Sequence, residues 1–127
     1  MNPYIFREYD IRGVVKDDFQ TDVVINLGKS FGTYIKRNNG KIIAISGDIR
    51  PSSKQLINDF ISGVIMTGIN VLDMGICPTP VNYFSLFHFD IDGSVQITGS
   101  HNPPQFNGFK LSFNKSPFYG KQIQELK

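Results

Sequence analysis

Segments with the pattern of amphipathic helices alternate with short apolar segments along this chain, and that order limits the folds it can adopt. Residues 21–37 and 53–67 repeat apolar side chains with the helical period of 3.6 residues, and residues 78–89 predict a third helix. Short apolar stretches at 41–47 and 69–75 have the pattern of strands buried on both faces. Helices between such strands imply crossover connections and a mainly parallel sheet.

Two more strands are predicted in the C-terminal half, at 93–98 and 108–113. In the second of them, apolar residues at alternate positions face one way, which sends Lys110 to the opposite face. We therefore expect one three-layer α/β/α domain over residues 1–127, with a mainly parallel (mixed), four-stranded sheet and helices on both of its faces.

The starts of the predicted helices carry residues that favour helix initiation. Thr21 is expected to cap the first helix and Ser52 or Ser53 the second. Thr79 is expected to cap the third, with Pro80 at its first helical position. The final residues, "GKQIQELK", begin a helix that stops after about two turns. Such an ending is expected for a domain that belongs to a longer chain.

Charge and composition argue against several classes of partner and site. The chain carries 13 basic and 11 acidic residues, a net charge of +2, and the basic residues are scattered, which argues against nucleic-acid binding. The apolar runs are far shorter than the roughly 20 residues that span a bilayer, and no signal peptide is evident, so we expect a cytoplasmic protein without a membrane partner. One cysteine and two histidines argue against a disulfide or a zinc site.

The stretch "QITGSHNPPQFNGFK" is the strongest candidate for a functional loop. Ser100 follows a predicted strand at Gly99, where a sharp turn is expected to expose its hydroxyl, and two prolines then stiffen the loop. An exposed hydroxyl on a rigid support suits a nucleophile or a phosphate carrier. The alternative is a proline-rich turn in which Ser100 and Asn102 only cap backbone groups.

Two cationic side chains could serve such a hydroxyl. Lys110 could offset the charge of a phosphate or transfer a proton, although a solvated strand lysine is the alternative. Arg12, in "YDIRG", offers two parallel donors suited to phosphate oxygens, although a surface arginine paired with Asp10 has the same pattern.

The segment "GDIRPSS" follows the first predicted strand, so it should lie at the same sheet edge as the Ser100 loop. Asp48 and Arg50 of this segment are expected to brace each other across a turn rather than to contact a substrate. His101 is adjacent to Ser100, but the "GxSxG" pattern is missing, which argues against a serine hydrolase. Asp90 and Asp92 lack a third carboxylate at the same spacing and are interpreted as part of a turn.

Together, "FREYDIRG", "GDIRPSS" and "TGSHNPPQFNGFK" resemble the N-terminal domain of the α-D-phosphohexomutase family, and the resemblance covers almost the whole chain. It implies that Ser100 is a phosphoserine and that Lys110 is the general acid/base. It also implies that Arg12 and His101 assist near the phosphate. Tyr9 and Asn102 are then expected to bind the substrate.

The resemblance further implies an isomerase that interconverts hexose 1-phosphate and hexose 6-phosphate, of mannose or glucose, through a bisphosphate. Hexose 1,6-bisphosphate is the expected activator. Mg²⁺ is the expected metal, held through a phosphate on Ser100 and by residues outside this chain. Domains II–IV of the same protein are the expected partners, and the isolated domain is expected to be inactive. The alternatives are a non-catalytic module that binds phosphate or sugar phosphate, and a unit that serves only folding or interaction.

Overall fold

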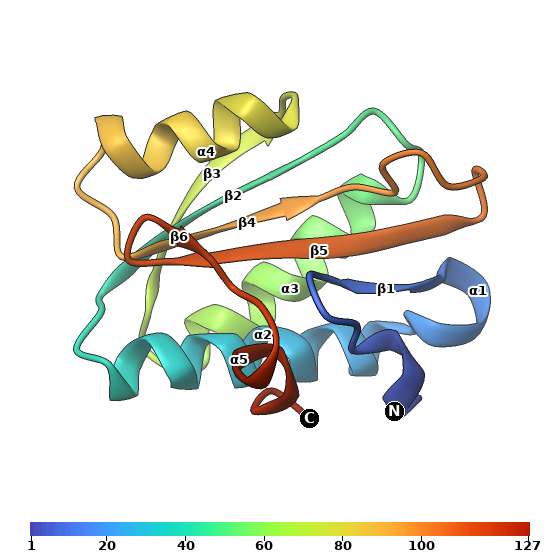
Figure 1. Ribbon diagram of the computed structural model, residues 1–127, viewed down its shortest axis with the longest axis horizontal. Helices are drawn as coiled ribbons and strands as arrows, with labels where there is room; N and C mark the ends of the chain where they lie inside the picture. Colours follow the sequence, from blue (N-terminus) through green and yellow to red (C-terminus); the bar gives the residue numbers. More distant parts are fainter.

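The computed structural model describes residues 1–127 and shows a six-stranded sheet between two layers of helices (Figure 1). No helix combines the length and the apolar character needed to cross a membrane. The elements follow in the order η1 (Pro3–Ile5), β1 (Ile11–Val14), α1 (Val15–Asp18), α2 (Thr21–Arg37), β2 (Ile42–Gly47), α3 (Ser53–Ile65), β3 (Asn70–Ile76), α4 (Thr79–His88), β4 (Gly93–Ile97), β5 (Phe106–Phe113), β6 (Ser116–Pro117) and α5 (Lys121–Gln124).

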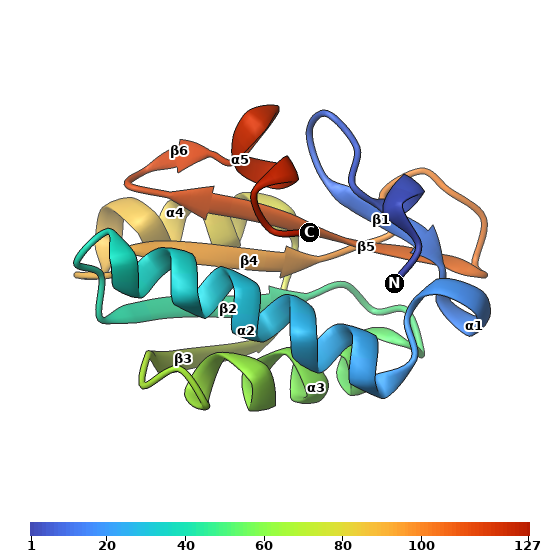
Figure 2. The same cartoon turned by 90° about the horizontal axis from the view of Figure 1, so that it is seen from below.

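The strands lie in the order β1-β5-β4-β2-β3. Strand β1 pairs with the first half of β5, and β6 pairs with the last two residues of β5. Strand β2 runs parallel to β3 and β4, whereas β5 is antiparallel to β4, β1 and β6. Helices α2 and α3 cover one face of the sheet and α4 covers the other (Figures 1 and 2). The predicted three-layer α/β/α class with a mixed sheet is confirmed.

The prediction of four strands was wrong, because β1 and β6 also belong to the sheet. Strand β1 is only four residues long and includes a glycine, so its own sequence gives little strand signal. It forms because β5, almost a hundred residues later, offers an unpaired edge to its backbone. The two added strands are both antiparallel to β5, so antiparallel pairings outnumber parallel ones in the whole sheet.

Strand β3 was predicted to be buried on both faces, and the structure contradicts this. None of the residues Asn70–Ile76 is buried. The strand is at the edge of the sheet, with β2 as its only neighbour, and it lies beyond the cover of α4. A continuous apolar run therefore indicated a strand correctly but not its position in the sheet.

The predicted helix caps were also wrong in part. Thr21 and Thr79 are the first helical residues, and the capping positions belong to Gln20 and Pro78. Ser52 does occupy the capping position of α3, but its side chain makes no capping hydrogen bond. Its hydroxyl instead accepts a hydrogen bond from Asn107 of β5 at 2.8 Å, so a contact with the sheet has replaced a local one.

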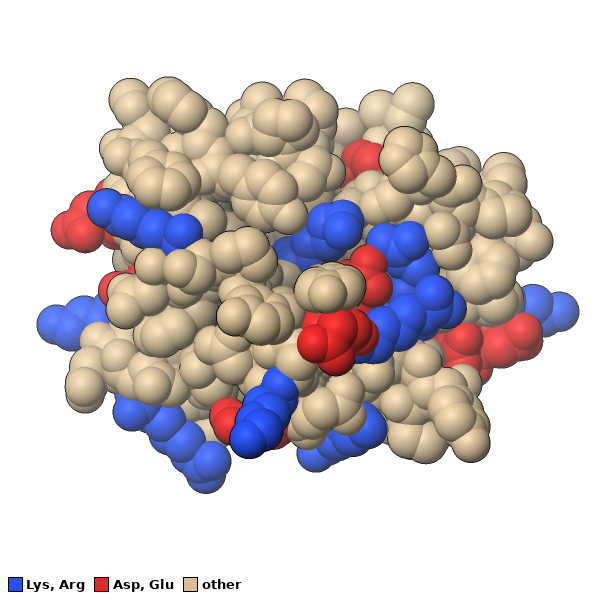
Figure 3. Space-filling view, in the orientation of Figure 1, with Lys and Arg blue, Asp and Glu red and all other residues tan.

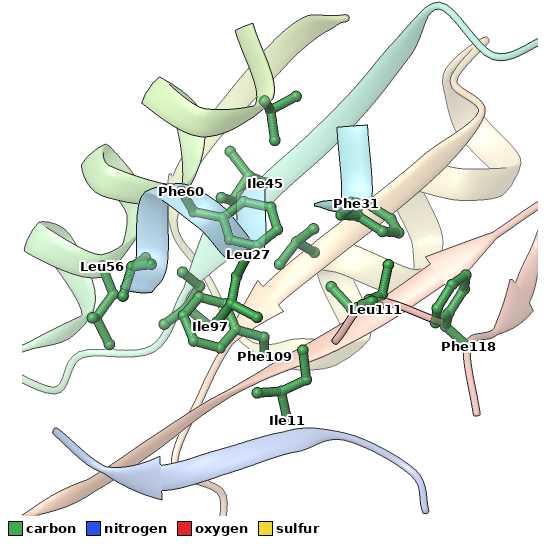
Figure 4. Packing of buried hydrophobic residues seen from close by; sticks show 14 of the residues in the cluster. Ile11, Leu27, Phe31, Ile45, Leu56, Phe60, Ile97, Phe109, Leu111 and Phe118 are labelled. Atoms are coloured by element: carbon green, nitrogen blue, oxygen red, sulfur yellow. The ribbon is translucent and has the colours of Figure 1, made fainter. Parts of the chain in front are cut away.

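The hydrophobic core lies between the sheet and the pair α2 and α3, where side chains from both layers interdigitate (Figure 4). Phe60 of α3 stacks on Phe109 of β5, with ring centroids 5.3 Å apart. The two helices approach each other closely at Gly28 and Gly63, because any Cβ at either position would meet the backbone of the facing helix. This packing holds β5, and with it Lys110, on a rigid layer.

Candidate active site

The loops after β2 and β4 lie side by side at one edge of the sheet, as predicted (Figure 1). Both follow the carboxyl ends of parallel strands, the edge at which open α/β sheets bind ligands. Strand β1 borders the same region through its antiparallel pairing with β5, which places Arg12 opposite Gly108. Three segments that are far apart in the sequence thereby bring polar side chains to one place.

Ser100 is exposed at the start of the loop after β4, in a left-handed backbone conformation with φ of 52°. For a residue other than glycine this conformation costs about 1–2 kcal/mol and is concentrated at functional sites. The turn was expected at Gly99, but Gly99 has no positive φ, so the strained residue is the serine itself. The Ser100 N–H donates to Thr98 Oγ1 at 3.0 Å, which helps to hold this conformation.

Arg12 is the side chain that contacts the Ser100 hydroxyl. Its Nη2 donates to Ser100 Oγ at 3.2 Å, and its Nη1 donates to Asn102 Oδ1 at 2.9 Å. Nη2 also forms an ion pair with Asp10, and the Nε–H is buried without a partner. Neither Ser100 Oγ nor Asn102 Oδ1 caps a backbone group; both accept from Arg12. The sequence left open whether Arg12 pairs with Asp10 or serves the Ser100 hydroxyl. In the structure it does both.

Lys110 reaches the same group of residues through Asp10. Its Nζ lies 3.7 Å from Asp10 Oδ2, the oxygen that also pairs with Arg12. Asp10 is only 9% exposed, so one nearly buried carboxylate holds two cations next to the loop that carries the serine. The prediction that Lys110 faces away from the core is confirmed, because Phe109 and Leu111 on either side of it are buried.

Tyr83 of α4 lies near this group on the same face of the sheet. Its burial, together with the negative charge of Asp10, raises the pKa of the Tyr83 hydroxyl above its ordinary value of 10.0. The phenol is therefore neutral at physiological pH and keeps its proton as a hydrogen-bond donor. Tyr83 was not predicted as a site residue, since its helix looked like ordinary core.

Asp48 and Arg50, from the loop after β2, hold the backbone of the loop that carries Ser100. Asp48 accepts hydrogen bonds from the Ser53 hydroxyl at 2.5 Å and from the Gly99 N–H at 3.1 Å, and it pairs with Arg50 Nε at 3.3 Å. Arg50 in turn donates to backbone carbonyls of the loop. The geometry agrees with a structural role for both residues, as expected from the sequence, and extends it from a local turn to the neighbouring loop.

The surroundings of Asp48 stabilise its charged form. Burial alone would raise the pKa of Asp48, but the hydrogen bonds from Ser53, from the backbone of Arg50 and Gly99, and from Thr98 outweigh it. They hold the pKa below the ordinary value of 3.8. Asp48 is thus ionised at neutral pH and acts as a fixed acceptor beneath the loop.

Four of the predicted site residues come together, and two do not. Ser100, Arg12 and Asn102 are in direct contact, and Lys110 joins them through Asp10. The His101 side chain is exposed and forms no hydrogen bond, and Tyr9 is 73% exposed. Charged side chains of both signs gather over β5 and β1, below an uncharged region over α4 (Figure 3).

Asp10 is the residue whose importance the sequence did not reveal. The sequence indicated Asp10 only as a partner of Arg12, whereas in the structure it also holds Lys110. Asp10 directly precedes β1 and is two residues from Arg12, so continued extended backbone places both side chains on one face of the sheet. The chain contains no cluster of three or more histidine, cysteine, aspartate or glutamate side chains that could bind a metal ion. Asp92 instead accepts hydrogen bonds from the backbone at the start of β2.

An exposed hydroxyl in contact with a guanidinium, with an ammonium held nearby through a shared carboxylate, is suited to receiving and releasing a phosphoryl group. Residues 3–126 match the family model described as phosphoglucomutase/phosphomannomutase, alpha/beta/alpha domain I. The chain belongs to this family.

Individual members of the phosphohexomutase family are similar to this chain in sequence and in fold. A phosphomannomutase/phosphoglucomutase of Pseudomonas aeruginosa is 37% identical over 97% of this chain, and a phosphomannomutase of Vibrio cholerae is 36% identical over 84%. A crystal structure of a phosphoglucomutase/phosphomannomutase family protein from Burkholderia thailandensis superposes with a TM-score of 0.94 at 35% identity, covering 99% of this chain. The chain spans 27%, 23% and 29% of these three proteins, respectively.

Proposed function

We propose that this chain is the phosphoserine-bearing domain of a four-domain phosphohexomutase, which interconverts hexose 1-phosphate and hexose 6-phosphate of mannose or glucose. The observation that carries the proposal is the contact of Arg12 with Ser100 Oγ, together with the ion pair that ties Lys110 to the same carboxylate. A serine hydroxyl is a poor leaving group, so phosphoryl transfer through it requires cations and a proton carrier at this position.

In the proposed reaction, the free hydroxyl of a hexose monophosphate attacks the phosphorus of phosphorylated Ser100. A bond forms between the sugar oxygen and phosphorus, and the bond between phosphorus and Ser100 Oγ breaks. The proton of the sugar hydroxyl passes by way of Lys110 to Ser100 Oγ, which leaves a hexose bisphosphate and a free serine. Transfer of the other phosphoryl group back to Ser100 completes the isomerisation, and a hexose 1,6-bisphosphate can load the serine at the start.

The chain's own residues have separate roles in this scheme. Arg12 stabilises negative charge on the phosphoryl oxygens through Nη2, which already reaches Ser100 Oγ. Asp10 orients the two cations. Asn102 holds Arg12 in place. His101 is exposed in the loop, and Tyr9 is exposed just before β1, so both are free to meet a substrate.

The proposed Mg²⁺ would be held by a phosphate on Ser100 and by residues of other domains. This chain has no cluster of three histidine, cysteine, aspartate or glutamate side chains that could hold the ion alone. For the same reason we propose that the isolated domain does not turn over. Domains II–IV of the same protein, with the hexose phosphate, are the proposed partners, and the cytoplasm is the proposed location.

Replacing Ser100 with alanine in the full-length protein tests this proposal. We expect Ser100→Ala to abolish interconversion of glucose or mannose 1-phosphate and 6-phosphate, while Ser116→Ala, at an exposed serine in β6, retains it. Normal turnover by Ser100→Ala would refute the proposal. Binding of hexose phosphate without turnover by the wild-type protein would identify the alternative, a non-catalytic sugar-phosphate-binding module.

A further inference from the structure

We propose that Arg50 is a positioning residue for the loop that carries Ser100. It acts through the backbone of that loop and does not contact the substrate. This inference rests on the proposed function for its catalytic consequence, but its structural part concerns the loop alone. The loop after β4 would then depend on a side chain from the loop after β2, about fifty residues earlier in the chain.

The guanidinium of Arg50 binds four backbone carbonyls of one short segment. Its Nη1 donates to Pro103 at 2.7 Å and to Phe106 at 2.9 Å. Its Nη2 donates to Asn102 at 2.6 Å and to Ser100 at 3.2 Å. These contacts connect the beginning and the end of the loop to a single planar group, so the loop cannot change shape without breaking several of them.

The remaining donor of Arg50, Nε, also serves to hold this loop. Nε pairs with Asp48 at 3.3 Å, and Asp48 also accepts from the Gly99 N–H. Four of the five N–H donors of this guanidinium are hydrogen-bonded to the loop, and Nε lies in the ion pair with Asp48, so the group is occupied by the protein rather than open to a phosphate. Arg12 differs, since its Nε has no partner and its Nη2 reaches Ser100 Oγ. The two arginines therefore have different tasks at one loop.

The loop needs an external brace because its own backbone offers few hydrogen bonds. Two successive prolines have no N–H to donate, and only the amides of Asn102 and Phe106 bond to backbone carbonyls within the segment. Ser100 is held in a left-handed conformation that its side chain disfavours. A lysine at position 50 would keep the positive charge but has three donors without the planar fork, so it cannot reproduce the contacts.

Amide hydrogen exchange of the full-length protein tests the brace without relying on catalysis. We expect Arg50→Lys to speed exchange at the amides of Asn102 and Phe106 at least tenfold, with exchange in β4 and β2 unchanged. Arg37→Lys is the matched control, because Arg37 is exposed at the end of α2 and forms no side-chain hydrogen bond or ion pair. Unchanged exchange in Arg50→Lys would overturn the proposal, as would equal acceleration throughout the sheet, which would mark a general loss of stability.

Steady-state kinetics of the same variants test the catalytic consequence. We expect kcat to fall at least tenfold in Arg50→Lys with KM within about twofold of the wild-type value, and guanidinium ion to restore part of the turnover lost in Arg50→Ala. A change confined to KM would mean that Arg50 binds substrate, and the proposal would be wrong. If wild-type Ser100 accepts no phosphate while Arg50→Lys still loosens the loop, the proposed function fails and the positioning of the loop by Arg50 stands.

Discussion

Substitution of Gly99 by alanine should destabilise the domain by a steric clash with Arg50. A Cβ at position 99 would lie 2.5 Å from Arg50 Nη1 and closer still to Nε and Cζ, whereas real Cβ contacts are longer than 3.0 Å. The guanidinium must therefore move away from the loop. Because its carbonyl contacts are 2.6–3.2 Å long, a displacement of about 1 Å takes them beyond hydrogen-bonding distance.

The expected cost follows from the four hydrogen bonds that would be lost. Each contributes about 0.5–1 kcal/mol net, since water can replace the donor at this partly exposed loop, so Gly99→Ala should lower the free energy of unfolding by about 2–4 kcal/mol. Backbone strain adds nothing, because Gly99 does not have a positive φ. Equilibrium unfolding in urea, followed by circular dichroism, measures this difference against a total stability of about 5–15 kcal/mol.

A double-mutant cycle separates the clash from any other effect of the added methyl group. In an Arg50→Ala background the guanidinium is absent, and Gly99→Ala should cost less than about 0.5 kcal/mol or even stabilise the domain by restricting the unfolded chain. The coupling free energy between the two positions should therefore be about 2–4 kcal/mol. An equal cost of Gly99→Ala in both backgrounds would refute the proposed clash.

Three further substitutions probe other parts of the site. Ser100→Gly should be more stable than Ser100→Ala by about 1 kcal/mol in urea unfolding, because glycine relieves the left-handed strain; equal stability would argue against strain. Asp48→Asn should lower stability at pH 7, and its difference from the wild type should shrink as the pH falls below 3.8, because the native pKa of Asp48 is depressed and its contribution is lost on protonation. A difference that did not shrink between pH 7 and pH 2 would contradict this. Asp10→Asn should reduce kcat about tenfold or more by releasing Lys110 and Arg12, and an unchanged kcat would exclude a role for Asp10 in positioning them.

Local patterns were sufficient to predict most of the fold. The bounds of α2 follow from its apolar period, and the burial of Phe109 follows from the alternation along β5. Features that depend on distant partners were not predictable in this way. Strand β1 exists because β5 is available beside it, and β3 is exposed because no strand lies beyond it. The apolar sequence of β3 is the same in either position, so only the sheet order determines its exposure.

In the candidate site, too, local features were predictable and those that depend on distant partners were not. The residue types of Ser100, Lys110 and Arg12 indicated phosphate chemistry, and the structure brings them to one edge of the sheet. The connection between the two cations could not be predicted, because it depends on the antiparallel register of β1 with β5. That register pairs Ile11 with Phe109, and the preceding residue, Asp10, lies beside Lys110. The predicted role of Gly99 as the residue of the sharp turn was wrong. Gly99 provides space for the guanidinium of Arg50, and the positive φ belongs to Ser100.

Locating the transferred phosphate is the decisive measurement for the proposed role of Ser100. The full-length protein would be exposed to glucose 1,6-bisphosphate, digested and mapped by tandem mass spectrometry, with Ser100→Ala treated in parallel. We expect one phosphate on the peptide that contains Ser100, assigned to that residue, and its disappearance after hexose monophosphate is added. A protein that interconverts hexose phosphates while its phosphate maps to another residue, or while Ser100 is never phosphorylated, would contradict phosphoryl transfer through Ser100.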